Sequence, residues 1–169
     1  MDRVFDPKAM LDTLNRHEVS YILIGALGAL FHGSPVRTND ADICPARTNS
    51  NLTLLASALD ELQARLRTPD ELEGVPFVCD AETLNRAELW TLVTRFGDLD
   101  LSFVPSGTQG YDDLKKSATI VPFEGTDVPV ASLLDIIRSK EAAGRAKDRA
   151  VLPLLRDMLD RFGEHPDVK

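Results

Sequence analysis

A strand, a short helix and a second strand follow one another within residues 20–44, and this order constrains the fold more than any other part of the chain. The segment Ser20–Gly25 is a continuous apolar run that ends in glycine, which is typical of a buried strand. Small residues then predict a short helix over Ala26–His32. The segment Asp40–Cys44 alternates polar and apolar side chains, so we expect a half-buried strand with one polar face.

The two aspartates of this second strand point to the same side. Residues two apart on a strand project from one face, about 6.5 to 7 Å apart along the backbone, and this applies to Asp40 and Asp42. Two unpaired carboxylates at this spacing repel one another and resist desolvation, so a cation is expected between them. Mg²⁺ prefers oxygen ligands and is usually held by one or two carboxylates together with substrate phosphates. A metal ion therefore accounts for the pair.

A second pair of aspartates occurs later, in the segment FGDLDLSF. Asp98 and Asp100 share one face of the strand that this segment predicts. If the two strands are neighbours, Asp100 completes a three-carboxylate cluster that can hold two metal ions about 3.5 to 4 Å apart. Asp98 directly follows Gly97 and is interpreted as a solvated turn residue. One Asp-x-Asp pair alone is more often structural, but two pairs combined with the glycine turn favour a metal site.

Helices are predicted elsewhere from capping residues and apolar periodicity. A leucine stripe at positions 52, 55, 59, 62 and 66 predicts one long helix, and Gly144 is expected to separate the last two. The predicted helices cover Pro7 to about Arg16 after the cap Asp6, Asn49 or Ser50 to about Arg67, a short stretch around 81–88, Ser132 to Ala143, and Ala146 to about Phe162.

Further strands are predicted from short runs rich in β-branched and aromatic residues. The segments 119–123 and 126–130 are expected to pair across a turn at Glu124 and Gly125, and the proline in each makes both of them candidates for edge strands. The remaining predicted strands are 75–79, 89–96 and 98–104.

Size and composition indicate one compact soluble domain. The chain has 169 residues, of which 43% are hydrophobic and 27% charged, so it can bury a sizeable core. Its start shows no apolar run of signal-peptide length and no segment approaches a membrane span, so we expect a cytoplasmic protein that binds no membrane. Cys44 and Cys79 are expected to be reduced thiols.

Charge is unevenly distributed along the sequence. The formal net charge is −8, which argues against a surface that grips nucleic acid over its whole extent. Seven basic and four acidic residues nevertheless lie between Arg138 and Arg161, so a local positive site for a polyphosphate is compatible with the sequence. Lys140 and Lys147 are seven residues apart and would share one face of an unbroken helix. Solvated helix lysines are the alternative interpretation.

These motifs together resemble the nucleotidyltransferase superfamily related to DNA polymerase beta. The first signature of that superfamily reads here as Ile24, Gly25 and Ala26, followed by thirteen residues before Asp40. The chain is most similar to the toxin-type branch, the AbiEii and MenT-like group. There an arginine and a threonine precede the carboxylates, as Arg37 and Thr38 do here, and a closing pattern of lysine, arginine and Lys-Asp matches Ser139–Asp148.

The resemblance implies an α+β fold, in which a small mixed β-sheet is flanked by helices and a C-terminal helical segment. It divides the chain into a catalytic core over residues 1–130 and a helical segment over residues 131–169 packed on it. It implies Mg²⁺ at a two-metal site, with Mn²⁺ as the alternative, and a nucleoside triphosphate as substrate. Asp40 and Asp42 would bridge both metals, while Asp100 would bind the catalytic metal and help to take the acceptor proton.

The resemblance also implies a set of groups around the triphosphate. Gly25 and Ala26 would lie under the β and γ phosphates, although Ala26 stands where the superfamily usually has glycine or serine and so offers no hydroxyl. Arg37 would contact phosphate or support a carboxylate, and Thr38 would cap the turn. The closing pattern would supply Lys140, Arg145, Lys147 and Asp148, with Lys140 acting in catalysis and Arg145 and Asp148 free to pair with each other or with the site.

Three functions are compatible with these residues. The first is a toxin of a toxin–antitoxin system that transfers a nucleotide to the 3′ end of tRNA, with a cognate antitoxin as partner. The second keeps the chemistry but modifies a protein or a small molecule, as in AMPylation or antibiotic modification. The third is a nucleotide-binding domain without activity, which the alanine at position 26 would explain.

Overall fold

The computed structural model describes residues 4–162 and shows a mixed seven-stranded sheet in the order β3-β4-β5-β2-β1-β7-β6. β2 runs antiparallel to β1 and parallel to β5, so the two strands that carry the aspartate pairs are direct neighbours. The strands are β1 Tyr21–Ile24, β2 Asp40–Pro45, β3 Arg65–Leu66, β4 Leu89–Thr94, β5 Gly97–Ser102, β6 Thr119–Phe123 and β7 Thr126–Val130.

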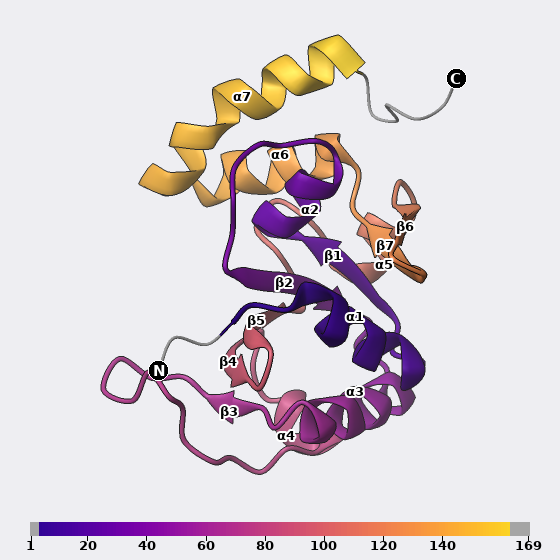
Figure 1. Cartoon of the computed structure of the whole chain (residues 1–169), viewed down its shortest axis with the longest axis vertical. Coiled ribbons are helices and arrows are strands. Elements are labelled where there is room, and N and C mark those ends of the chain that lie inside the picture. The colour runs from indigo at the N-terminus through magenta and orange to yellow at the C-terminus, as the bar shows by residue number, and fades with distance from the viewer. Residues whose placement is uncertain (1–3, 163–169) are drawn as a thin grey trace.

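Helices cover both faces of the sheet and gather at the two ends of the molecule. Figure 1 shows α6 and α7 together at one end, and α3 and α4 at the other, with the sheet between them. The helices are α1 Pro7–Arg16, α2 Gly25–Phe31, α3 Asn49–Glu61, α4 Ala81–Leu84, α5 Tyr111–Lys115, α6 Leu133–Ala143 and α7 Ala146–Phe162. This is the α+β architecture that the sequence predicts, with a sheet flanked by helices and a C-terminal pair of helices.

The main hydrophobic core lies between one face of the sheet and the helices α1 and α3. Ala41 and Ile43 of β2 and Leu99 and Leu101 of β5 are fully buried there. They alternate along their strands with the aspartates, so the carboxylates point to the opposite face. Leu52, Leu55 and Leu59 of α3 pack onto this core as the stripe predicts.

A second, smaller core lies on the face that carries the aspartates. Ile22 and Cys44 of the sheet pack there with Ile136 of α6 and Leu155 of α7. Ser132 caps α6 by accepting a hydrogen bond from the backbone N–H of Asp135 at 3.0 Å. The aspartates of β2 and β5 on this face stay only partly buried.

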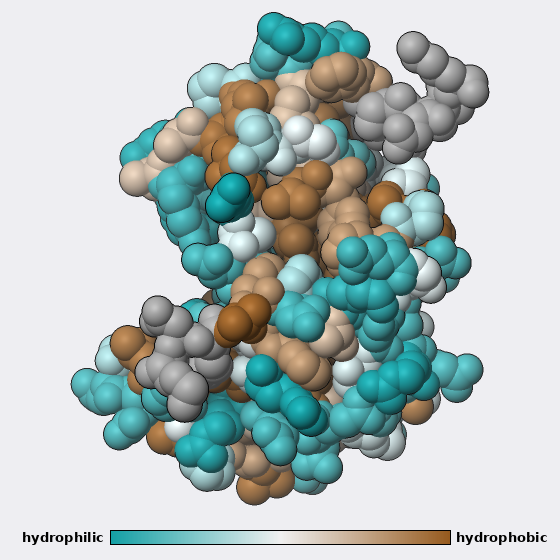
Figure 2. Space-filling view, in the orientation of Figure 1, coloured by the Kyte–Doolittle hydropathy of each residue, from teal (hydrophilic) through white to brown (hydrophobic). Residues whose placement is uncertain are grey.

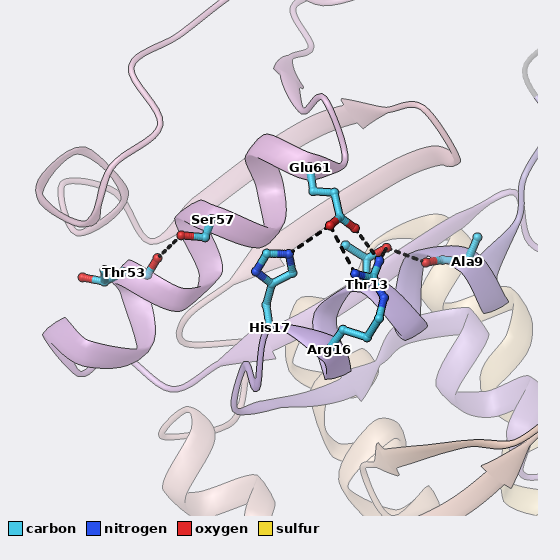
Figure 3. A network of polar contacts seen from close by, with 7 residues as sticks. All are labelled: Ala9, Thr13, Arg16, His17, Thr53, Ser57 and Glu61. Carbon is cyan, nitrogen blue, oxygen red and sulfur yellow. Dashed lines mark hydrogen bonds and ion pairs between the residues drawn. The ribbon is translucent and has the colours of Figure 1, made fainter.

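A polar contact network on the surface joins α1 to α3. Figure 3 shows Glu61 of α3 facing Arg16 and His17, which lie at the end of α1. Arg16 donates to both carboxylate oxygens of Glu61, and the Nε2 atom of His17 lies 3.3 Å from the nearer one. The hydrogen bonds from Arg16 lower the pKa of Glu61 to about 2, and His17 adds to the effect. The two helices that cover the main core are therefore also held together at their surface.

Asn51 of α3 fixes that helix to the start of β1 and the end of β2, and its removal is expected to destabilise the fold. Its Nδ2 atom donates to the carbonyls of Ser20 at 2.9 Å and Ala46 at 2.7 Å, and its Oδ1 atom accepts from the N–H of Ser20 at 2.7 Å. Asn51→Ala removes these three hydrogen bonds, and of the backbone groups only the carbonyl of Ser20 keeps a partner within the described chain, the N–H of Ala46 at 3.0 Å, so we expect a loss of about 2 to 4 kcal/mol in the free energy of unfolding. Denaturant titration measures it. The exposed Asn49→Ala on the same helix is the control, and equal losses in both variants would contradict the prediction.

Several predicted boundaries were wrong. α3 begins after Thr48, whose hydroxyl accepts from the N–H of Asn51, and it ends at Glu61, so Leu66 lies in strand β3 and not in the helix. The segment 75–79 forms one isolated bridge, between Val75 and Leu66, in place of a strand. The short helix α5 was not predicted.

The predicted pairing of residues 119–123 with 126–130 is confirmed, because β6 and β7 form an antiparallel hairpin. Of these two strands, however, only β6 lies at an edge of the sheet, since β7 also pairs with β1. Pro129 of β7 is paired in register with Ile120, so its proline did not exclude this strand from an inner position.

The structure also bears on the expected absence of membrane spans and on the state of the two cysteines. No helix among residues 4–162 is long and apolar enough to cross a membrane. Both cysteines are free thiols, and burial raises the pKa of Cys44 to about 12 and that of Cys79 to about 11. The division into a core and a C-terminal segment stays a prediction, and residues 163–169 of that segment lie outside the described residues.

Candidate active site

Strand pairing brings the two aspartate pairs side by side. In the parallel register of β2 and β5, Asp40 is opposite Asp98 and Asp42 is opposite Asp100. One carboxylate oxygen each from Asp40, Asp42 and Asp100 lies within 4.8 Å of the other two. The three residues predicted as metal ligands therefore form one cluster on the polar face of the sheet.

Burial and mutual repulsion both oppose ionisation within the cluster. Burial raises the pKa of Asp42 to about 7, and repulsion from Asp40 and Asp100 adds to the effect, while Lys147 and Lys140 oppose it. Burial also raises the pKa of Asp100, against the attraction of Arg67. A carboxyl group that resists ionisation among other carboxylates gains free energy when a cation joins it.

One oxygen of the cluster has no partner, and this supports a metal site. Oδ1 of Asp100 is buried and accepts no hydrogen bond within the described part of the chain. Its nearest cationic atom is Nη2 of Arg67 at 3.8 Å, which is too far for a hydrogen bond. Buried polar atoms are nearly always satisfied, so an unpaired oxygen beside two further carboxylates fits a divalent cation with oxygen ligands.

Position 25 requires glycine because the backbone there passes directly against the cluster. Gly25 begins α2 with φ +68°, and a Cβ atom at this position would lie 2.3 Å from Oδ2 of Asp42. The strand-to-helix turn thus passes directly against the second aspartate. Any side chain larger than hydrogen would displace that carboxylate, so glycine serves both the turn and the cluster.

Thr38, and not Arg37, supports the first aspartate. The hydroxyl of Thr38 donates to Oδ1 of Asp40 at 2.7 Å. Arg37 is exposed, does not line the cavity described below, and forms no ion pair with Asp40 or Asp42 among the described residues. Thr38, and not Arg37, thus contacts a carboxylate of the cluster here, and the role of Arg37 toward phosphate stays a prediction.

A cavity of about 550 Å³ opens beside the carboxylates. Figure 2 shows hydrophobic side chains gathered between the two ends of the molecule on the face that it draws, with hydrophilic side chains around them. The wall of the cavity contains all three clustered aspartates, both residues of the glycine turn, three basic residues and further polar and apolar groups. Its charged and turn residues are Gly25, Ala26, Asp40, Asp42, Asp100, Asp135, Lys140, Arg145 and Lys147.

The basic residues of the cavity come from two helices. Gly144 adopts a left-handed conformation and ends α6, so Lys140 lies on α6 and Lys147 on α7. The expected break at Gly144 is confirmed, so Lys140 and Lys147 do not share one helix face, yet both side chains line the same cavity because the helices pack together there. The sequence could not show this, since the turn at Gly144 decides how α7 returns.

Asp148 holds these basic groups from behind the cavity wall. Its side chain is fully buried and does not line the cavity. It accepts from Nε of Arg145 at 2.7 Å and lies 3.7 Å from Nζ of Lys140. Burial opposes its ionisation, but these cations prevail and lower the pKa of Asp148. Of the two options left open for Arg145 and Asp148, the structure shows pairing with each other.

Arg67 is a residue near the site that sequence reasoning missed. It follows β3, and its guanidinium forms an ion pair with Asp98, the residue predicted to be a solvated turn aspartate. No periodicity or motif marks Arg67, because it is 31 residues away from its partner in sequence and lies in a segment predicted to be helical. Only the pairing of β3 with β4 brings it to this face.

Comparisons with known proteins are informative at the level of structure. No protein-family model and no curated protein sequence matches the chain. The lincosamide antibiotic adenylyltransferase LnuA, bound to lincomycin, aligns over 93% of this chain and 99% of its own, with a TM-score of 0.61 and 15% identity. The antibiotic-resistance factor ANT(2'')-Ia aligns over 89% and 80%, with a TM-score of 0.56 and 12% identity.

A third structure, an antigenic nucleotidyltransferase-like protein from Paracoccidioides brasiliensis, aligns over 90% of this chain and 72% of its own, with a TM-score of 0.53 and 20% identity. The chain has the nucleotidyltransferase fold. The predicted fold class is thereby confirmed, whereas similarity to the toxin-type branch stays a prediction. In this nucleotidyltransferase fold, the carboxylate cluster lies on the accessible face of the central sheet.

Proposed function

We propose that the protein is a metal-dependent nucleotidyltransferase, which moves a nucleoside monophosphate from a nucleoside triphosphate to an acceptor hydroxyl. The observation that carries the proposal is the group of three carboxylates within 4.8 Å beside a cavity lined by Lys140, Arg145 and Lys147. The cluster supplies anionic ligands for Mg²⁺ or Mn²⁺, and the basic residues supply charge for a triphosphate. The fold likeness supports this chemistry.

In the proposed reaction, the acceptor oxygen bonds to the α-phosphorus while the bond to the bridging oxygen breaks and pyrophosphate leaves with the electron pair. Bound divalent ions would supply charge neutralisation between the carboxylates and the phosphates. Asp40, Asp42 and Asp100 would hold these ions, and Asp100 would also help to take the acceptor proton. Gly25 and Ala26, together with Lys140 and Lys147, position the β and γ phosphates.

Asp148 is a positioning residue in this scheme. By binding Arg145 and Lys140 from behind, it orients two cations toward the cavity without occupying the cavity itself. A direct role of Asp148 in binding nucleotide, as the sequence resemblance implies, has no support from its buried position.

A small acceptor fits the surface charge better than an RNA does. Five of the seven basic residues of the segment 138–161 are already used in ion pairs: Arg138 with Asp113 and Asp135, Lys140 and Arg145 with Asp148, Arg156 with Glu141, and Arg161 with Asp157. Binding of RNA draws on cations that are available to many phosphates. Two of the similar structures are antibiotic-modifying or antibiotic-resistance proteins, which adds support for a small molecule that carries a hydroxyl group. The tRNA-directed toxin with an antitoxin partner stays a prediction.

The test is transfer of label from α-labelled nucleoside triphosphates in the presence of Mg²⁺. Separate reactions contain a panel of aminoglycosides and lincosamides, total tRNA, or the protein alone. We expect Mg²⁺-dependent label on a small acceptor from at least one nucleotide, and none with EDTA. Label on tRNA would establish the toxin-type reaction instead, and label on protein would establish AMPylation. Absence of transfer in every reaction would contradict the proposal and favour a domain that only binds nucleotide.

A further inference from the structure

Four carboxylates, and not three, occupy the accessible face of β2 and β5. The register places Asp98 opposite Asp40 and Asp100 opposite Asp42. The metal-binding cluster contains only Asp40, Asp42 and Asp100. Strand alternation alone does not separate Asp98 from Asp100, since both point to the same face of β5. Something in the structure therefore separates these two aspartates.

Arg67 makes that distinction. Its backbone N–H donates to the carbonyl of Thr91 at 3.0 Å, which anchors it beside β4 directly after β3. Its Nη1 atom donates to Oδ2 of Asp98, while its Nη2 atom stays 3.8 Å from Oδ1 of Asp100. The same guanidinium thus pairs closely with one aspartate and leaves the other with an unpartnered oxygen.

We propose that Arg67 is a positioning residue of the metal centre, which withdraws Asp98 from the site and keeps Asp100 available as the third ligand. The inference rests on the metal binding of the proposed function. The side chain of Arg67 is 28% exposed and those of Asp98 and Asp100 are 32% and 21% exposed, so the pair lies where solvent screens charges only in part. A planar guanidinium can face two carboxylates at once, whereas a lysine offers one point charge.

Loss of Arg67 has opposite effects on metal affinity and on catalysis. Arg67→Ala frees Asp98 and removes one positive charge a few ångströms from the ligands, so it makes the site more anionic. We expect Mn²⁺ to bind about tenfold more tightly, which corresponds to removal of one charge at partly screened distance. We expect kcat to fall about 10- to 100-fold, the usual range for groups that orient metal ligands. A purely structural role would weaken binding or leave it unchanged.

The experiment measures Mn²⁺ binding to the full chain by calorimetry, with circular dichroism to confirm folding. Arg67→Lys retains the charge and is expected to keep the affinity of the wild type while lowering kcat. The double variant R67A/D98N removes both partners of the ion pair, so its Mn²⁺ affinity should return to within about threefold of the wild type. The matched control is Arg65→Ala, two residues earlier in β3, because Arg65 donates to the carbonyl of Gly74 and forms no ion pair with Asp98 or Asp100 among the described residues.

Three outcomes are decisive. Tighter Mn²⁺ binding by Arg67→Ala that is reversed in R67A/D98N establishes the role of Arg67. Equal Mn²⁺ affinity in the wild type, Arg67→Ala and Arg65→Ala would overturn the inference while leaving the proposed function intact. A wild-type protein that binds no Mn²⁺ would overturn the proposed function and this inference with it.

Discussion

Asp42→Asn is expected to abolish nucleotide transfer and at the same time to stabilise the metal-free protein. Asp42 is the most strongly perturbed of the clustered carboxyl groups, since burial and the neighbouring aspartates raise its pKa to about 7. A neutral amide removes a metal ligand, and we expect kcat/KM to fall by about a thousandfold or more, the cost of several kcal/mol of transition-state stabilisation. In EDTA, the same change relieves repulsion and should raise the stability by about 1 to 3 kcal/mol.

The pH dependence of the metal-free protein provides a second measurement of the same effect. The folded pKa of Asp42 lies above its ordinary value of 3.8, so protonation favours the folded state. Stability in EDTA should therefore decrease as the pH rises from about 4 through 7, and Asp42→Asn should flatten this decrease. Thermal unfolding monitored across that range measures it, and the stabilisation at pH 8 should raise the Tm by roughly 3 to 10 °C.

Exposed Asp70→Asn is the control, because it makes the same chemical change away from the cluster. We expect it to alter neither the transfer rate nor the Tm in EDTA. If Asp42→Asn retained transfer within tenfold of the wild type, Asp42 would not be a ligand of the catalytic centre. If it destabilised the metal-free protein, the charge balance described for the cluster would be incorrect.

Gly25→Ala is expected to be nearly as damaging to activity, although it changes no functional group. The new methyl group would lie 2.3 Å from Oδ2 of Asp42, and the backbone would be forced to keep φ +68° with a side chain. The left-handed conformation costs about 1 to 2 kcal/mol for alanine. Displacement of the carboxylate by about 1 Å should reduce transfer about 100-fold or more, because reacting groups tolerate little misplacement. Turnover and Mn²⁺ affinity measured together test this prediction.

Gly125→Ala separates the backbone effect from the contact with Asp42. Gly125 has φ +87° in the turn between β6 and β7, and a Cβ atom there would meet no atom within 4 Å. We expect this control to lose a similar amount of stability while keeping wild-type transfer and Mn²⁺ affinity. Equal loss of activity in both variants would show that general destabilisation, and not the position of Asp42, explains the result.

Local features of the fold were predictable because they depend on residues close together in the sequence. The alternation of Asp40 to Cys44 and of the segment around Asp100 correctly placed the aspartates on one polar face, and the cap Ser132 and the break at Gly144 marked the last two helices. The predicted boundaries of α1 and α7 also agree with the structure. Strand periodicity and helix caps are short-range signals, so one sequence suffices to read them.

The candidate site depended on longer-range information. Periodicity states which face a carboxylate takes, but it does not state which strand lies next to it or in what register. The sequence therefore allowed the pairing of β2 with β5 only as an assumption, and the structure shows it. Arg37 belongs to a sequence motif but lies outside the cavity. Arg67 belongs to no motif, yet its side chain reaches the aspartates.

The sequence by itself determined that the chain carries two strands with paired aspartates, a glycine turn before the first pair and a basic stretch near the end. Tertiary structure decided that Asp40, Asp42 and Asp100 come together, because their approach depends on the parallel pairing of β2 with β5. It also decided that Lys140 and Lys147 meet in one cavity from different helices. These arrangements follow from packing between segments far apart in the chain, which local patterns do not encode.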